Sequence, residues 1–330
     1  MQTSLFDYHL LADRIAQKSI EPRDHAKLLV MDRETGELQD RHIFDLPDLL
    51  APGDLLVMNN SKVFKARLTA HRGASIFEIF LLRPNKSHWL ALAQPAKKLR
   101  VGDQLTLING TALTLVEKNF DGTILIDFQK SPEEILALTD QIGEIPIPPY
   151  VKNQPKNLTD YQTIYAEKTG SVAAPTAGFH FTTELLQKLK MKGIKQGFVT
   201  LHVGLGTFRP MKTETLEEHK MHEEWVDVPE ETRVLIEKTK QAGHRVIAIG
   251  TTTVRALESD MTSGFTQIFI TPGYSFKKID GLLTNFHLPK STLLVLVSAF
   301  SSRTNILRAY QHAMDHEYRF YSFGDAMLII

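Results

Sequence analysis

Histidines that stand beside runs of small residues are the side chains of this sequence best suited to proton chemistry. The stretch SVAAPTAGFHFT (171–182) places three alanines, a proline and a glycine before His180, and a phenylalanine flanks that histidine on each side. Glycine lets a ligand approach the backbone closely, and histidine exchanges protons near neutral pH. We therefore predict that this segment forms the surface of a binding site against which a ligand lies. The alternative is a tight apolar loop. The predicted ligand contacts are Ala174, Pro175, Thr176, Gly178 and Phe181.

A second histidine ends a predicted strand. In LHVGLGTFRP (201–210), His202 is followed by two glycines and a threonine. The G-x-G pattern lacks the third glycine of a dinucleotide-binding loop, and the proline at position 210 blocks an immediate helix interior. We predict a ligand-binding turn beside a proton-transfer group; the alternative is a structural histidine in a strand. The candidate contacts are Gly204, Gly206, Thr207 and Phe208.

A third segment, IAIGTTTVR (247–255), reads as an apolar strand that ends in glycine and opens a helix. The free amides of a helix start favour a carboxylate or a phosphate. Thr251 and Thr252 add hydroxyl donors, and Arg255 could hold a carboxylate through two hydrogen bonds. The alternative is ordinary capping of the helix by threonine.

Polar side chains also gather before a predicted apolar helix in LTNFHLPKST (283–292). The helix that follows, 293–300, is almost entirely apolar and is expected to be buried. Asn285, His287 and Lys290 at the entrance of a buried helix predict the edge of a pocket. The alternative is a serine cap with a polar loop.

Paired histidines raise the question of a metal. In EEHKMH (217–222), His219 and His222 are spaced to share one face of a helix, as are His312 and His316 further on. Zinc binding by these pairs is one interpretation. The other is a solvated charged turn or a pair that faces the ligand, and we expect no metal.

The elements that must position these residues fall into two patterns. Residues 61–130 read as short strands separated by turn signals, which is typical of a small barrel or sandwich. From about residue 160 strands and helices alternate, with one strand expected at 266–270, and this pattern indicates α/β layers. We predict an α/β main domain with a layered, mixed sheet, formed by residues 1–60 and 151–330. An inserted small β-barrel domain is predicted to occupy residues 61–150.

Composition narrows the class of protein. Lysine plus arginine and aspartate plus glutamate both number 38, and cysteine is absent, so disulfides and thiolate ligands are excluded. No charged-then-apolar leader is visible. The longest apolar run, 293–297, falls far short of the roughly 20 residues that span a bilayer. We expect a cytoplasmic monomer without membrane contact.

Six segments in order resemble the S-adenosylmethionine:tRNA ribosyltransferase-isomerases, a family of the queuosine pathway. They are SVAAPTAGFHFT, LHVGLGTFRP, EEHKMH, IAIGTTTVRALES, LLTNFHLPKSTLLVLVSAF and YRFYSFGDAMLI. The N-terminal FDYHLLADRIAQ and PGDLLVMNN are similar as well, so the resemblance spans the chain.

The resemblance implies a reaction in which S-adenosylmethionine donates its ribosyl group rather than its methyl group. The acceptor is 7-aminomethyl-7-deazaguanine at the wobble position of tRNA with a GUN anticodon. The products are epoxyqueuosine in tRNA, adenine and methionine. The implied fold is an α/β domain with an inserted barrel, and no cofactor beyond the co-substrate S-adenosylmethionine is expected.

The same resemblance suggests roles for individual residues. His180 and His202 are the expected proton-transfer groups, because a base must take a proton beside the sulfonium and an acid assists departure of adenine. Asn59 and Arg67 are expected to contact substrate. The family pattern N-D-T reads Asn59-Asn60-Ser61 here, so no carboxylate role carries over to position 60.

Contact with tRNA requires positive charge, and Lys97, Lys98 and Arg100 of the predicted barrel are the candidates for binding phosphate. Three other functions compete with the main one. They are an S-adenosylmethionine-dependent tRNA methyltransferase, a non-catalytic tRNA-binding protein and a metal-dependent hydrolase. The glycine-rich loop expected of the methyltransferase after a first N-terminal strand is not found.

Overall fold

The computed structural model describes residues 1–148, 150–152, 155, 157–204 and 211–330. The chain divides into two compact units. The first unit contains Met1–Ser61, Gln162–Lys168 and Pro175–Ile330, and the second contains Lys62–Tyr161 and Thr169–Ala174. None of the helices within these described ranges combines the length and apolar character needed to cross a bilayer.

A mixed sheet forms the frame of the first unit. In the described part of the chain it has nine strands in the order β15-β13-β12-β3-β14-β16-β17-β1-β2. Their bounds are β1 Lys27–Met31, β2 Leu38–His42, β3 Leu55–Asn59, β12 Lys195–His202, β13 Glu224–Asp227, β14 Val246–Ile249, β15 Ser263–Thr266, β16 Gly281–Asn285 and β17 Ala326–Ile329. The neighbours β12, β3, β14 and β16 run parallel, so their carboxyl ends share one edge of the sheet.

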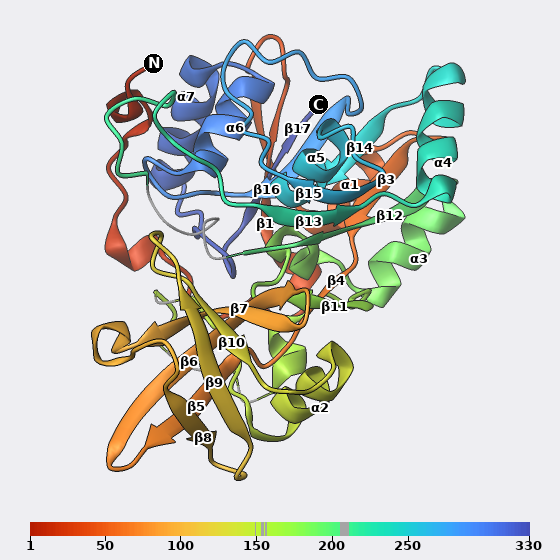
Figure 1. Cartoon of the computed structure of the whole chain (residues 1–330). Helices are drawn as coiled ribbons and strands as arrows, with labels where there is room; N and C mark the ends of the chain where they lie inside the picture. Colours follow the sequence, from red (N-terminus) through yellow and green to blue (C-terminus); the bar gives the residue numbers. More distant parts are fainter. Residues whose placement is uncertain (149, 153–154, 156, 205–210) are drawn as a thin grey trace. The chain divides into compact units, whose positions relative to one another are not determined.

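Helices cover both faces of this sheet, and α6 and α7 pack side by side (Figure 1). The α-helices of the unit are α1 Leu46–Leu49, α3 Thr183–Met191, α4 Glu230–Gln241, α5 Thr251–Glu258, α6 Thr292–Phe300 and α7 Arg303–Asp315. Alternate residues of β1, β3, β14 and β17 form one buried cluster with Leu185 and Leu189 of α3. The α6 helix begins after Ser291, whose side chain accepts a hydrogen bond from the amide of Leu294.

Short 3-10 helices occur in both units. They are η1 Thr3–Phe6, η2 Ala12–Arg14, η3 Arg23–His25, η4 Ile43–Asp45, η5 Ala96–Lys98, η6 Leu158–Tyr161 and η7 Thr176–His180. The η7 turn belongs to the first unit and carries His180 at its end.

The second unit is a closed antiparallel barrel of six strands within the described residues, in the order β10-β7-β6-β5-β8-β9. Its strands are β5 Arg67–Arg72, β6 Ser75–Asn85, β7 His88–Gln94, β8 Gln104–Leu107, β9 Ala112–Lys118 and β10 Ile124–Asp127. Helix α2 (Pro132–Ile142) begins with a capping box at Ser131 and Glu134, and Ile135 and Leu138 join the barrel core. Strands β4 Ser61–Val63 and β11 Lys168–Ser171 pair where the chain passes between the units.

The predicted fold class, an α/β domain with a mixed sheet plus a small barrel, is confirmed. One local prediction is wrong. The strand expected at 266–270 lies at Ser263–Thr266, where it pairs with β13 and Phe265 packs edge-on against Trp225. Of the two alternatives for the segment with His219 and His222, the structure has the turn, which is closed by the bond from the His219 amide to the Leu216 carbonyl.

Candidate active site

The carboxyl edge of the parallel strands is organised by Asn59, the last residue of β3. Its side-chain nitrogen donates to the carbonyl of Leu201 (2.9 Å) and to Oγ1 of Thr252 (3.3 Å). Its oxygen accepts from the amides of Leu201 (3.1 Å) and Ser61 (3.0 Å). Asn59 is fully buried and all its hydrogen-bonding positions are used. It therefore joins three strand and helix ends, and the direct substrate contact predicted for it is not available in this geometry.

The segment 171–182 is shaped mainly by the protein's own packing. A Cβ at Gly178 would lie 2.0 Å from the Tyr165 hydroxyl oxygen, and Ala177 lies within 3.4 Å of where a Cβ of Gly250 would stand. Phe181 is completely buried in the sheet core. The prediction that Gly178 and Phe181 contact a ligand is therefore corrected, because neighbouring protein atoms already occupy those places. Of the other predicted contacts, Ala174 and Pro175 are buried and Thr176 is half-buried.

Within this segment, His180 lines a pocket together with its neighbour Phe179. The pocket has an empty volume of about 190 Å³ and is lined by Arg23, Phe179, His180, Arg319, Phe323 and Gly324, among others. Burial lowers the pKa of His180 to about 4, against an opposing effect of Asp325, so the imidazole is neutral at pH 7.

His202 ends β12 at the same edge of the sheet. Its Nδ1 lies 3.3 Å from Oγ of Ser61. Burial lowers the pKa of His202 to about 4, so this imidazole is also neutral at pH 7 and able to accept a proton. Gly204 follows on the same segment, whereas the predicted contacts Gly206, Thr207 and Phe208 lie outside the described residues.

The amino-terminal end of α5 is buried. Thr251 and Thr252 are buried, and Gly250 adopts the left-handed φ of 87° that places the helix start against Ala177. Arg255, predicted to bind a ligand carboxylate, instead forms an ion pair with Glu224, and both side chains are 3% exposed. Its Nε and Nη2 atoms have no partner among the described residues.

Glu224 is a residue that sequence reasoning missed. Besides pairing with Arg255, it accepts a hydrogen bond from the amide of Gly204 (3.0 Å). The sequence signal that could have indicated Glu224 is its position, as an acidic residue, at the start of the apolar strand EWVDV. A buried carboxylate of that kind requires a cation or several donors nearby.

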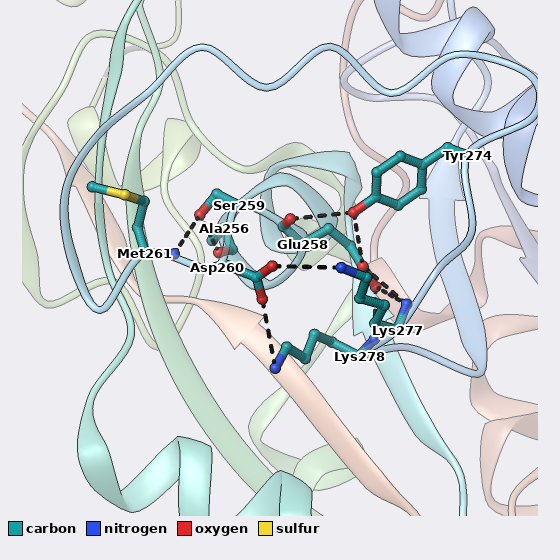
Figure 2. Close-up of polar contacts among 8 residues, drawn as sticks. All are labelled: Ala256, Glu258, Ser259, Asp260, Met261, Tyr274, Lys277 and Lys278. Carbon is teal, nitrogen blue, oxygen red and sulfur yellow. Dashed lines mark hydrogen bonds and ion pairs between the residues drawn. The ribbon is translucent and has the colours of Figure 1, made fainter.

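The other end of α5 is fastened by Glu258 (Figure 2). This buried carboxylate accepts from the amides of Lys277 (3.0 Å) and Lys278 (2.9 Å) and from the hydroxyl of Tyr274 (3.1 Å). Burial, together with Glu258, raises the pKa of Tyr274 to about 12. Asp260 pairs with both lysines at 3.8 and 3.6 Å. The segment between β15 and β16 is thus tied to the helix that carries the threonines and Arg255.

The structure places the side chains of Asn285, His287 and Lys290 in three different environments. Asn285 is buried and lies 3.3 Å from His180 Nε2. His287 contacts Oγ1 of Thr284 at 3.0 Å, and burial lowers its pKa to about 3. Lys290 pairs with Asp7 of the N-terminal segment at 2.7 Å. Only Asn285 therefore lies against one of the predicted proton-transfer groups.

The residues predicted on the barrel remain on its surface or in its own ion pairs. Arg67 of β5 binds Glu78 at 2.7 Å and lies over the ring of Phe80. The side chains of Lys97, Lys98 and Arg100 are exposed on and after the η5 turn. These three cations are available to a polyanion.

The histidine pairs differ in their surroundings. His219 packs edge-on against Phe269, and burial and neighbouring His222 lower its pKa. His312 of α7 and His316, the residue after this helix, stack at 3.8 Å and lie near Asp40, with one ligand atom of each residue within 4.8 Å of the others. Among the described residues this is the group that has the spacing to hold a metal ion, and none of its members lines the pocket at His180.

Comparison with known proteins gives matches that cover the chain. A family model described as "Queuosine biosynthesis protein" matches residues 3–329. Proteins named S-adenosylmethionine:tRNA ribosyltransferase-isomerase from Staphylococcus aureus strains Newman and JH9 are 48% and 47% identical over 344 residues, covering all of both chains. The crystal structure of an S-adenosylmethionine tRNA ribosyltransferase from Thermotoga maritima matches at 36% identity with a TM-score of 0.58. That match covers 99% of this chain and 100% of the other.

Proposed function

This chain belongs to the queuosine biosynthesis protein family, and we propose that it transfers the ribosyl group of S-adenosylmethionine to tRNA and isomerises it. The acceptor is 7-aminomethyl-7-deazaguanine at the wobble position of tRNA with a GUN anticodon. The products are epoxyqueuosine-containing tRNA, adenine and methionine. The enzyme works as a cytoplasmic monomer, with S-adenosylmethionine as a co-substrate.

The observation that carries this proposal is a full-length match to enzymes of that name combined with two neutral histidines in the first unit. The positive sulfur of S-adenosylmethionine acidifies the adjacent C5′ protons. A neutral imidazole can therefore remove one of them at pH 7, whereas an imidazolium could not. His180 and His202 are the candidates.

The pocket at His180 is lined by aromatic side chains. Phe179 and Phe323 stack with their ring centres 5.8 Å apart and an interplanar angle of 21°, and both line the pocket. Aromatic faces of this kind favour a planar base. We assign the pocket to the adenine of the donor or the deazaguanine of the acceptor.

Binding of tRNA uses the exposed cations of the barrel. Lys97, Lys98 and Arg100 lie within five residues of one another on a surface turn. Contacts of lysine and arginine to phosphate supply affinity without reading sequence. The turn is accordingly assigned to the tRNA backbone.

The direct test is incubation of the protein with S-adenosylmethionine and tRNA that carries 7-aminomethyl-7-deazaguanine. Mass analysis of nucleosides should show epoxyqueuosine, with adenine and methionine released in equal amounts. Formation of S-adenosylhomocysteine would instead identify a methyltransferase, and tRNA binding without either product would identify a binding protein. A chelator should leave turnover unchanged, and its loss on chelation would favour the hydrolase alternative.

Single replacements H180A and H202A test the two proton-transfer candidates. Each should reduce turnover to background while tRNA binding is retained, because neither histidine lies on the cationic turn. Near-normal turnover of either variant removes that histidine from the reaction.

A further inference from the structure

We propose that Asn285 is a positioning residue that fixes the tautomer of His180. In that tautomer His180 carries its proton on Nδ1 and serves as a neutral hydrogen-bond donor to the substrate. The inference rests on the proposed ribosyl transfer for its catalytic consequence, but the tautomer itself can be measured without turnover.

The orientation of the Asn285 amide follows from its neighbours. Its nitrogen lies 3.0 Å from the carbonyl oxygen of Tyr321, 3.5 Å from that of Asp325 and 3.3 Å from His180 Nε2. A carbonyl oxygen can only accept, so the amide nitrogen rather than the amide oxygen must face this side. In the reverse orientation the amide oxygen of Asn285 would face the carbonyl oxygens of Tyr321 and Asp325, and none of these three atoms could donate. The amide nitrogen carries two N–H groups, and its two shortest contacts are those to the Tyr321 carbonyl and to His180 Nε2. Because this nitrogen can only donate, Nε2 of His180 accepts and the imidazole proton resides on Nδ1.

The loop that supplies these carbonyls is held in an unfavourable conformation. Tyr321 has a φ of 74°, which an aromatic residue rarely adopts and which costs on the order of 1–3 kcal/mol. Its carbonyl accepts from the Gly324 amide (2.9 Å) as well as from Asn285. The turn is closed by Asp325, which accepts from the Arg319 amide (2.7 Å) and from Arg319 Nη2 (2.9 Å). The loop thus holds the Tyr321 carbonyl in place to orient Asn285.

The Asn285 amide does not satisfy all of its own hydrogen-bonding atoms in this orientation. The amide oxygen of Asn285 is buried and has no partner among the residues described. Leaving a buried acceptor without a partner costs about 1–3 kcal/mol. Such a cost is expected where a group is aimed at a functional neighbour rather than optimised for stability.

With Nε2 of His180 facing Asn285, the other imidazole nitrogen, Nδ1, remains for a ligand. No described residue accepts a hydrogen bond from Nδ1 of His180, and His180 lines the pocket beside Phe179 and Phe323. A neutral imidazole N–H in a buried site stabilises negative charge that develops on a bound group, without transferring its proton. Adenine gains such charge as it departs with the electron pair of its bond to the sugar. His180 is therefore assigned to the leaving base, and His202 to proton removal.

The tautomer can be observed by long-range ¹H–¹⁵N correlation spectra of the full chain labelled with ¹⁵N-histidine, with H180Q used to assign the signal. The expected spectrum shows a protonated Nδ1 and an unprotonated Nε2. In N285D the carboxylate accepts instead of donating, which should move the proton to Nε2. The kcat should then fall by on the order of 100-fold with little change in KM for S-adenosylmethionine. N119A removes an amide in the barrel and should change neither readout.

Several outcomes would overturn the inference. One is an Nε2-protonated His180 in the unmodified protein, a measurement that needs no variant to fold. Another is an N285D protein whose tautomer is reversed but whose kcat is unchanged. A third is an N285D protein with lost activity but the original tautomer, which would indicate a structural role. If the unmodified protein transfers no ribosyl group, the proposed function fails while the tautomer result still stands.

Discussion

Acid should destabilise the first unit through the buried His180, and the size of the effect can be calculated. The imidazole is 4% exposed, and burial lowers its pKa from 6.5 to about 4 in the folded protein. Because the folded pKa lies below the unfolded value, the unfolded chain binds the proton first as the pH falls. The stabilisation is therefore complete above pH 6.5 and is lost progressively as the pH falls toward 4.

The magnitude follows from the two pKa values. Between pH 7 and pH 5 an unfolded histidine gains most of one proton, whereas His180 gains almost none in the folded state. One pKa unit corresponds to about 1.4 kcal/mol, so this residue lowers the free energy of unfolding by about 2 kcal/mol over that interval. His202 and His287 act in the same direction, because burial lowers their pKa values to about 4 and about 3.

The assay is urea unfolding followed by circular dichroism at pH 7 and pH 5. H180Q replaces the imidazole with an amide that does not titrate, so the fall in stability between the two pH values should be about 2 kcal/mol smaller than in the parent protein. H9Q, at an exposed position, controls for the loss of a histidine on the surface. An H180Q protein that loses as much stability as the parent would refute the reasoning.

Three further predictions follow from particular contacts. D54A should lower the free energy of unfolding by about 1–3 kcal/mol in urea titrations, because the buried carboxylate accepts from the amides of Ala51 and Arg245 and pairs with the partly exposed Arg245 side chain; an unchanged stability would contradict this. E258Q should speed hydrogen exchange of the amides at 277 and 278, which the carboxylate binds, whereas D260N should not; equal rates in both variants would argue against the tie seen in Figure 2. K97A/K98A should weaken tRNA binding and reduce the slope of log affinity against log salt by about 2, while K188A/K190A on α3 should keep the parent slope. An unchanged slope in K97A/K98A would remove the barrel turn from the tRNA site.

Local patterns predicted much of the fold because the forces behind them are local. The apolar helix expected at 293–300 begins within a residue of that expectation, directly after Ser291. The barrel was predictable from its spacing of short strands and turns. The strand at 266–270 was misplaced because pairing with β13, more than 35 residues earlier in the chain, selects which residues form the ladder.

The candidate site was predictable as a set of segments but not as a set of contacts. His180, His202 and Asn285 were singled out by residue type and by their place beside strand ends and helix starts. Glu224 was missed because its partner Arg255 is 31 residues away in sequence, and only burial shows that the two must pair. Contacts with a ligand were predicted for Gly178 and Phe181, although protein atoms surround both residues.

The sequence by itself determined the layered α/β class, the barrel insertion and the family, because periodicity, turn residues and long ordered motifs are properties of the chain alone. The tertiary structure decided what each candidate residue touches. It set Gly178 against Tyr165, Arg255 against Glu224, and Asn285 between Tyr321 and His180. Burial and hydrogen bonding between segments far apart in the chain determine charge states and tautomers. Those properties therefore exist only once the chain has folded.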